Sequence, residues 1–206
     1  MSSAAILDID RLSRHAQGLG GPAAFSGVSS NMLSFGFPPI GSPRARILIL
    51  GTLPGRRSIE LGEYYANPLN AFWKIMATGI PDLPADYAER VAMLSDHGIA
   101  VWDVLAAATR SGSLDSAIAK DAIPNNFRAF FQIYPNVRLV CFNGLTAAAL
   151  YQRHVVRTLT EGQRTIAERT LPSTSGAHAR LTLAQKVAQW SILWTPRSDE
   201  LSHISS

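Results

Sequence analysis

Short apolar runs alternate with longer stretches of helical spacing along most of this chain. Apolar runs occupy residues 46–50 (RILIL), 99–104 (IAVWDV) and 137–142 (VRLVCF), and a fourth, weaker one lies within residues 164–173. Continuous apolar runs of this length are typical of strands that are covered on both faces. The pattern therefore predicts four strands of a mostly parallel sheet.

Segments with helical spacing and helix-ending signals separate these strands. Asn67-Pro68 suits an N-cap followed by proline at the first helical position, which predicts a helix from there to about Thr78. Four further helices are predicted: residues 86–98 ending at Gly98, a helix over FRAFFQIY capped by Asn125 or Asn126, residues 145–155, and residues 177–193. Strands that alternate with helices predict an α/β fold with helices on both faces of the sheet.

The length suits one domain, and we expect its compact part to span residues 36–196. Residues 1–35 are rich in Ala, Ser and Gly, so we expect a loosely ordered extension with a short helix near residues 6–15. Residues 197–206 are expected to form a polar tail.

Composition narrows the class of protein only slightly. Lys and Arg number 19 against 15 Asp and Glu, an excess that weakly favours polyanionic partners. Cys141 is the single cysteine and is expected in the core, so neither an internal disulfide nor a Cys-rich metal site is expected. No secretory segment and no apolar run of about 18 residues is present, so we expect a cytoplasmic monomer without a membrane span.

Three loops that follow predicted strands are unusually polar. They are GTLPGRRS at residues 51–58 with its continuation to Trp73, WDVL at residues 102–105, and LPSTSGAHA at residues 171–179. Loops after the carboxyl ends of parallel strands meet at one edge of the sheet and usually hold the site. General signatures for nucleotide binding or for a serine nucleophile do not occur in these loops, and the five histidines show no metal-ligand spacing.

Taken together, these loops resemble the uracil-DNA glycosylase superfamily, and most closely its hypoxanthine-DNA (deoxyinosine) glycosylase branch. The resemblance covers roughly residues 35–195 and rests on FGFPPI…ILILGTLPG (36–55), YYANPLNAFW (64–73), GIAVWDVL (98–105), FNG (142–144) and LPSTSGAHA (171–179). It implies a three-layer α/β/α sandwich around a short, mostly parallel central sheet. It also implies a monofunctional DNA glycosylase, without metal or cofactor. Such an enzyme removes uracil, hypoxanthine or xanthine from DNA and leaves an abasic site.

Three residues are expected to be catalytic, the first two by the resemblance and the third from the chemistry of the leaving base. Many branches place an Asp or Asn in the first loop to position the attacking water, but Thr52-Leu53-Pro54 contains neither, and in this branch Asn70 takes that role. Asp103 lies where the superfamily reads the base with Asn, and its carboxylate suits the ring N–H beside a carbonyl in uracil or hypoxanthine. His178, or backbone N–H groups of residues 173–176, would stabilise charge on the leaving base.

Further residues in the three loops, with Asn143 and Arg180 beside them, are expected to hold a flipped-out nucleotide. The predicted base-binding residues are Leu53, Tyr65, Phe72, Trp102 and Asn143, and the predicted phosphate-binding residues are Arg56, Arg57, Ser58, Ser173, Thr174, Ser175 and Arg180. In other branches an apolar wedge in the last loop fills the gap in the duplex, whereas the matching position here, Ser175 or Gly176, is too small. Either another residue intrudes or single strands are favoured.

A structural role is the alternative for each of these residues. Asn67 and Asn70 also suit helix caps, Asp103 a turn, and Asn143-Gly144 a strand-to-helix connection. One of residues 173–175 suits the cap of the last helix, the two arginines suit a solvated turn, and at least two of the aromatic residues in YYANPLNAFW are expected in the core. The alternative function is a non-catalytic nucleic-acid-binding module on the same fold.

Overall fold

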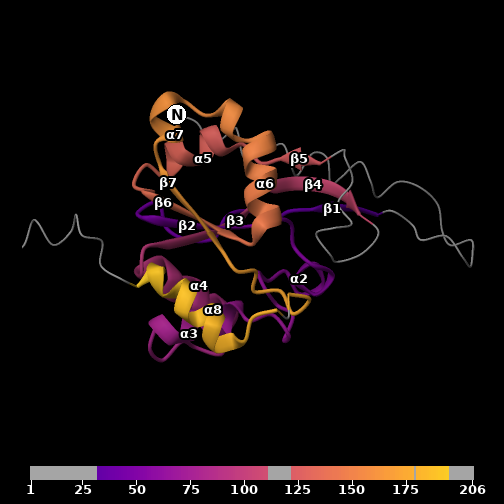
Figure 1. Cartoon of the computed structure of the whole chain (residues 1–206), viewed down its shortest axis with the longest axis vertical. Helices are drawn as coiled ribbons and strands as arrows, with labels where there is room; N and C mark the ends of the chain where they lie inside the picture. Colours follow the sequence, from indigo (N-terminus) through magenta and orange to yellow (C-terminus); the bar gives the residue numbers. More distant parts are fainter. Residues whose placement is uncertain (1–31, 111–121, 179, 195–206) are drawn as a thin grey trace, which may run out of the picture. The chain divides into compact units, whose positions relative to one another are not determined.

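The computed structural model describes residues 32–110, 122–178 and 180–194 of the 206-residue chain (Figure 1). The predicted helix near residues 6–15, most of the predicted extension and the polar tail lie outside the described residues. No helix within the described residues is long and apolar enough to span a bilayer.

A four-stranded parallel sheet forms the middle layer. Its order is β3 (Ile99–Asp103), β2 (Ile47–Gly51), β6 (Leu139–Asn143) and β7 (Ala167–Leu171), and all three pairings are parallel. Nearly every residue of β2, β3 and β6 is buried, because helices cover both faces of these strands. The four predicted strands are confirmed to within a few residues at each end.

Helices form the two outer layers (Figure 1). One layer holds α3 (Phe72–Gly79), α4 (Tyr87–Asp96) and α8 (Leu183–Trp190), and the other holds α5 (Phe127–Ile133), α6 (Leu145–His154) and α7 (Glu161–Arg164). Short 3-10 turns follow α6 and α8, η3 (Val156–Thr158) and η4 (Ser191–Leu193). The three-layer α/β/α arrangement implied by the resemblance is confirmed.

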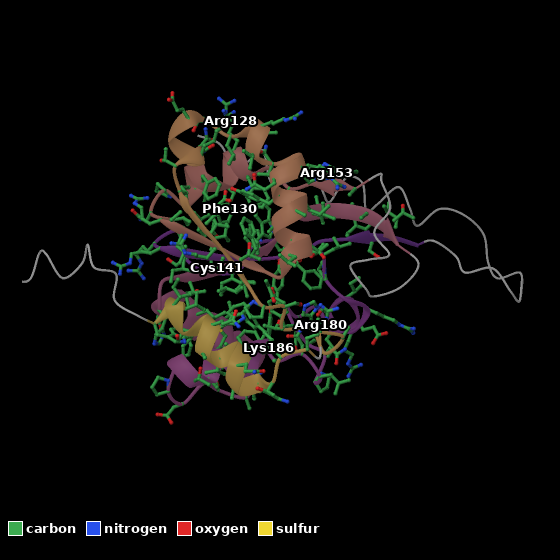
Figure 2. All side chains as sticks on the ribbon, viewed as in Figure 1. Arg128, Phe130, Cys141, Arg153, Arg180 and Lys186 are labelled. Carbon is green, nitrogen blue, oxygen red and sulfur yellow. The ribbon has the colours of Figure 1, made fainter. Side chains whose placement is uncertain are left out.

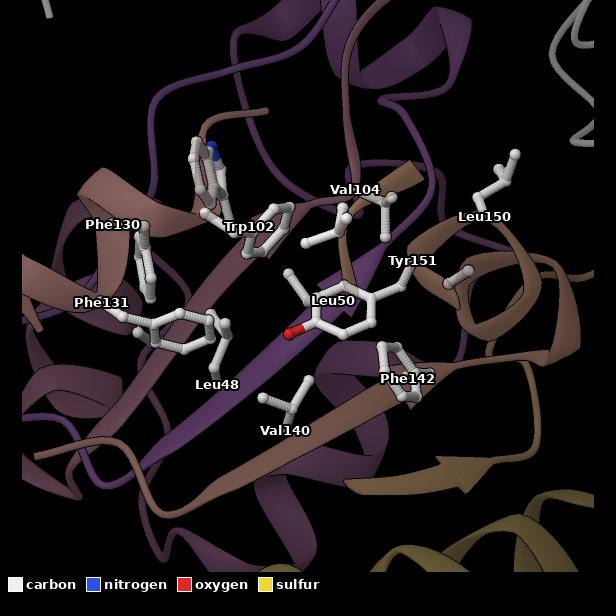
Figure 3. Close-up of a cluster of buried hydrophobic side chains, with 14 of the residues drawn as sticks. Leu48, Leu50, Trp102, Val104, Phe130, Phe131, Val140, Phe142, Leu150 and Tyr151 are labelled. Carbon is white, nitrogen blue, oxygen red and sulfur yellow. The ribbon is translucent and has the colours of Figure 1, made fainter. Parts of the chain in front are cut away.

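Apolar side chains fill the space between the sheet and each helical layer. Leu48 and Leu50 of β2 point into an aromatic cluster beneath α5 and α6 (Figure 3). Ile49 points to the opposite face and packs among side chains of α3 and α8, because successive strand residues alternate between faces. Cys141 lies in the middle layer and is fully buried, as predicted (Figure 2).

A second, antiparallel sheet was not predicted. Strand β4 (Leu105–Arg110) pairs with β1 (Met32–Phe35) on one side and with β5 (Ile123–Pro124) on the other. Four residues that we assigned to the extension are therefore a strand of this sheet, and the boundary drawn at residue 36 falls after a paired element. The Ala-rich sequence of β4 has a low strand propensity, and the strand is stabilised instead by its pairing with β1.

Two predicted helix starts are wrong. Helix α3 begins at Phe72, and the side chain of Asn67 instead accepts a hydrogen bond from the Leu69 N–H at 2.9 Å, which closes a turn. Helix α8 begins at Leu183 because Thr182 forms a capping box with Gln185, so residues 172–178 lie before this helix, in the loop after β7. None of the residues 173–175 caps this helix.

Other helix ends agree with their prediction. Gly98, predicted to end α4, follows this helix with a left-handed φ of 68°. Asp86, which we did not predict as a cap, caps α4 by accepting from the Glu89 N–H. Asn126, one of two residues proposed as the cap of α5, accepts from the Ala129 N–H at 3.1 Å. Short-range signals of this kind act between neighbouring residues, which is why the sequence displays them.

Candidate active site

The carboxyl ends of the parallel strands open into a pocket of about 480 Å³. Its walls are residues 51–58 after β2, residues 64–70 before α3, Asp103 at the end of β3, residues 143–146 after β6 and residues 173–178 after β7. Pockets for small ligands generally have volumes of about 300–1,000 Å³. The three polar loops that we predicted to converge therefore enclose one pocket of ligand size.

Most of the predicted site residues line this pocket. They are Leu53, Arg56, Arg57, Ser58, Tyr65, Asn70, Asp103, Asn143, Ser173, Thr174, Ser175 and His178. Three others, Phe72, Trp102 and Arg180, do not line it. Arg180 is exposed in the loop that leads to α8 (Figure 2).

Trp102 belongs to the core on the opposite face of the sheet. Its ring stacks on Phe130 with centroids 5.0 Å apart, and its Nε1 donates to the carbonyl oxygen of Phe37 at 3.0 Å. Asp103, the next residue of β3, faces the pocket, and neighbouring strand residues point to opposite faces. The prediction that Trp102 contacts a base in this pocket does not fit this placement.

Phe72 is fully buried directly behind Tyr65. The two rings are stacked with centroids 4.0 Å apart and an angle of 23° between their planes. Tyr65 has a left-handed φ of 57°, a conformation that costs a bulky residue on the order of 1–3 kcal/mol. Phe72 thus supports the pocket wall from the core, and Tyr65, in front of it, lines the pocket together with Tyr64.

Asp103 and Tyr65 meet over Gly51 at the bottom of the pocket. A Cβ atom at position 51 would overlap the Asp103 carboxylate and lie 3.1 Å from the Tyr65 hydroxyl, so only glycine leaves room for both. The Asp103 residue is 3% exposed. Burial, and to a lesser extent the Asp103 charge, raise the pKa of Tyr64 well above its usual value, so this neighbouring phenol stays neutral.

Asn70 combines a local structural role with a place in the pocket. Its Oδ1 accepts from the Phe72 N–H at 2.9 Å, and its backbone N–H donates to the carbonyl oxygen of Asn67 at 2.8 Å. The first bond fixes the side chain and assigns its Oδ1 and Nδ2, because an N–H can only face an acceptor, and the second bond fixes the backbone. The alternatives of a local cap and a pocket residue are therefore both realised in Asn70.

Asn143 and Thr174 join two loops through a pair of reciprocal hydrogen bonds. Asn143 Nδ2 donates to Thr174 Oγ1 and the Thr174 N–H donates to Asn143 Oδ1, each at 2.8 Å. The Thr174 carbonyl oxygen accepts from the Ala71 N–H at 2.8 Å, which connects the same point to the start of α3. Thr174 is 0% exposed, and the predicted contact of its hydroxyl with a phosphate does not fit this burial.

A short helix, α2 (Arg56–Leu61), forms the cationic rim, which the sequence presented as a loop. Arg56 Nε lies 3.0 Å from Glu60 Oε1, and Arg57 Nη1 lies 3.4 Å from Glu60 Oε2. Hydrogen bonds from Arg56 and then Arg57 lower the pKa of Glu60. The spacing of three and four residues between these charges was a signal for α2 that we did not use.

Turns closed by hydroxyl groups shape the loop after β7. The Ser175 N–H donates to Ser173 Oγ and the Ala177 N–H donates to Ser175 Oγ, both at 3.3 Å, and His178 lies exposed at the end of this segment. Ser58, across the pocket, is buried and accepts from the Ala66 N–H at 3.3 Å. Each hydroxyl uses its oxygen as acceptor and keeps a proton to donate.

Within the described residues, no group of three His, Cys, Asp or Glu side chains is arranged to hold a metal ion. The pocket offers one buried carboxylate, amides, hydroxyls, two tyrosine rings and two arginines at its rim. Such a set suits recognition and hydrolysis of a polar ligand that carries phosphates.

Comparison with known proteins identifies the family of this chain. The model of the uracil DNA glycosylase superfamily matches residues 38–195. A Methanosarcina acetivorans protein named hypoxanthine DNA glycosylase is 35% identical over 161 residues, which cover 77% of this chain and 96% of that relative. A Methanosarcina barkeri protein with the same name is 41% identical over 111 residues, which cover 53% of this chain and 70% of the relative.

A solved structure shares the fold. The solution NMR structure of a Methanosarcina acetivorans protein, described as a candidate uracil DNA glycosylase, is 34% identical and superposes with a TM-score of 0.67. The match covers 79% of this chain and 98% of that protein. The family model, the sequence relatives and the fold agree, and this chain belongs to the uracil DNA glycosylase superfamily.

Proposed function

We propose that this protein is a monofunctional DNA glycosylase that hydrolyses the N-glycosidic bond of deaminated bases in DNA and leaves an abasic site. The observation that carries the proposal is the pocket in which the Asp103 carboxylate, the Tyr65 ring and the Asn70 amide meet. Two relatives named hypoxanthine DNA glycosylase support hypoxanthine as a substrate base, and the uracil DNA glycosylase family model supports uracil. We include xanthine as a third candidate base.

Recognition of the base would take place at the bottom of the pocket. A base inside a duplex is out of reach, so the nucleotide must leave the stack and enter the pocket. Asp103, as an acceptor, suits the ring N–H beside a carbonyl that hypoxanthine and uracil share, whereas cytosine presents an acceptor there. Tyr65, held from behind by Phe72, would stack on the base, and Leu53 would contact it from the side.

Hydrolysis would depend on a water molecule held at the sugar by Asn70. The bond from C1′ to the base nitrogen breaks with its electron pair on the base, and the water oxygen bonds to C1′. The water releases one proton to solvent, and the leaving base takes up a proton. Asn70 is too weak a base to take this proton, but its fixed amide can orient the water. His178 at the rim would stabilise the charge on the departing base.

The rim of the pocket would hold the phosphates on either side of the extruded nucleotide. Arg56 and Arg57 supply charge, and Ser58, Ser173 and Ser175 supply hydroxyl donors. Arg180 lies outside the lining of the pocket, so we propose that it contacts a more distant phosphate. Binding that depends on these contacts should weaken steeply as salt is added.

The test is cleavage of labelled oligonucleotides that each carry one uracil, hypoxanthine or xanthine, followed by alkali to break the strand at abasic sites. We expect cleavage that depends on alkali, and its loss in Asn70→Ala with DNA binding retained. Asn126→Ala is the matched control, because it removes an equivalent amide that caps α5 outside the pocket. Binding without cleavage of any of the three bases would favour the non-catalytic module instead.

A further inference from the structure

Two large apolar side chains stand exposed at the mouth of the pocket. Leu69 and Leu145 are each 77% exposed, the highest values among the large hydrophobic residues that the structure describes, and both line the pocket. An exposed leucine forgoes on the order of 2 kcal/mol of burial, so two of them beside a site for DNA suggest an apolar contact with the ligand.

Leu69 stands on a rigid support. Its N–H donates to Asn67 Oδ1 at 2.9 Å, and the next N–H along the chain, that of Asn70, donates to the Asn67 carbonyl oxygen. Gly176 of the opposite loop lies so close that a Cβ atom there would be 3.0 Å from both the Cβ and the carbonyl oxygen of Leu69. The backbone of Leu69 is thus held between two loops while its side chain projects into solvent.

We propose that Leu69 inserts into the DNA stack and fills the space that the extruded nucleotide leaves. The inference rests on the proposed function. A duplex from which a nucleotide has been extruded has an apolar gap between neighbouring bases, and proteins that unstack bases commonly insert an apolar side chain. Leu69 directly precedes Asn70, so it would enter the gap beside the sugar that Asn70 addresses.

Leu145 is less suited to this role. It is the first residue of α6 and therefore lies at a helix N-terminus, where backbone N–H groups favour a phosphate over a base. Leu69, by contrast, contacts Gly176, the small residue in the loop after β7. The small size of Gly176 is explained by this contact, because any larger side chain would displace the leucine. Leu69 and the Gly176 that packs against it therefore come from different loops.

The experiment compares one lesion in a duplex with the same lesion in a single strand. We expect Leu69→Ala to lower the ratio of duplex to single-strand kcat/KM by at least about tenfold. Alanine buries less apolar surface in the gap than leucine does, so it offsets less of the cost of unstacking. Leu183→Ala is the control, since Leu183 is 46% exposed, begins α8 and does not line the pocket, and we expect the wild-type ratio from it.

A second measurement separates the wedge from a general loss of activity. In the Asn70→Ala background, 2-aminopurine placed next to the lesion in a duplex should brighten on binding, because its neighbour is unstacked. Adding Leu69→Ala should remove this signal at saturating protein.

Three results would overturn the assignment: an unchanged ratio in Leu69→Ala, a larger fall of the ratio in Leu145→Ala, or wild-type protein that cleaves only single strands. Wild-type protein that cleaves neither substrate would instead contradict the proposed function itself, so the two failures are distinguishable.

Discussion

The two walls of the pocket are built in different ways. The first wall, residues 52–71, is closed by side chains that accept from backbone N–H groups, those of Ser58, Asn67 and Asn70. The second wall, residues 172–178, follows the buried Leu171 and is itself buried at Thr174. After Thr174 it consists of short turns closed by serine hydroxyls, and these turns reach solvent. The first wall is fixed over its length, whereas the second is fixed mainly at one end.

This difference matters most for the groups that we propose to orient the base and the water. Groups that orient a base and a water must be held closely, because small displacements cost a large part of the rate. Groups that contact phosphates tolerate more freedom, since charge acts over a longer range. The bond from the Ala71 N–H to the Thr174 carbonyl oxygen connects the walls, so we expect the proposed reacting geometry to depend on Thr174 as well as on the first wall.

The largest effect is expected from the amide of the first wall. Asn70→Ala should lower the single-turnover cleavage rate at saturating enzyme by about 100-fold or more, a typical loss when one positioned polar group is removed. Asn70→Asp keeps an oxygen to accept from the Phe72 N–H, so it should retain the wall and lose less activity. Equal rates for Asn70→Ala and wild type would show that another residue orients the water.

A smaller effect is expected where the second wall is anchored. Thr174→Val preserves the shape of the side chain but leaves Asn143 Nδ2 without its acceptor, and a buried polar group without a partner costs about 1–3 kcal/mol. Urea unfolding should show this loss of free energy, whereas the backbone bond from the Ala71 N–H to the Thr174 carbonyl oxygen remains and keeps the two walls connected. Thr158→Val, which removes an exposed hydroxyl outside the pocket, should cost well under 1 kcal/mol.

A double-mutant cycle sharpens the same point. If Asn143 and Thr174 act as one unit, the variant with both Asn143→Ala and Thr174→Val should be only slightly less stable than either single variant. Additive losses would show that the two side chains contribute separately and that the second wall has another anchor.

The sequence displayed the parts of this fold that depend on neighbouring residues or on complete burial. Strands β2, β3 and β6 were predictable because they are covered on both faces. Gly98 after α4 and the cap Asn126 of α5 were predictable because each acts within a single turn. Strand β4 and helix α2 were missed. The first depends on pairing with a distant strand, and the second is only six residues long.

The site divides in the same manner. The convergence of loops followed from parallel strand order, but the bond between Asn143 and Thr174 joins residues 31 positions apart, and no local pattern reveals it. The position of Trp102 away from the pocket could have been predicted, because neighbouring strand residues point to opposite faces and Asp103 is the next residue. Leu69 was overlooked because we expected it in a helix that begins at Pro68. The helix begins at Phe72 instead, and Leu69 lies exposed in the turn before it.

The smallest effect is expected at the rim, where Glu60 pairs with both arginines of the first wall. Their hydrogen bonds lower the pKa of Glu60, so it is ionised at neutral pH and repels phosphate. Glu60→Gln should therefore tighten DNA binding about two- to fivefold at low salt, with a smaller gain at high salt because screening shortens the range of these charges.

The control for this change is Glu161→Gln, which alters the net charge equally but lies in α7, outside the lining of the pocket. If both variants bind DNA equally well in a salt titration, only net charge matters and the rim does not hold phosphates. If Glu60→Gln alone binds more tightly and Arg57→Gln binds more weakly, the first wall carries the phosphate contacts as well as the chemistry. The second wall would then contribute mainly its hydroxyl groups, and the contrast between the walls would extend from structure to binding energy.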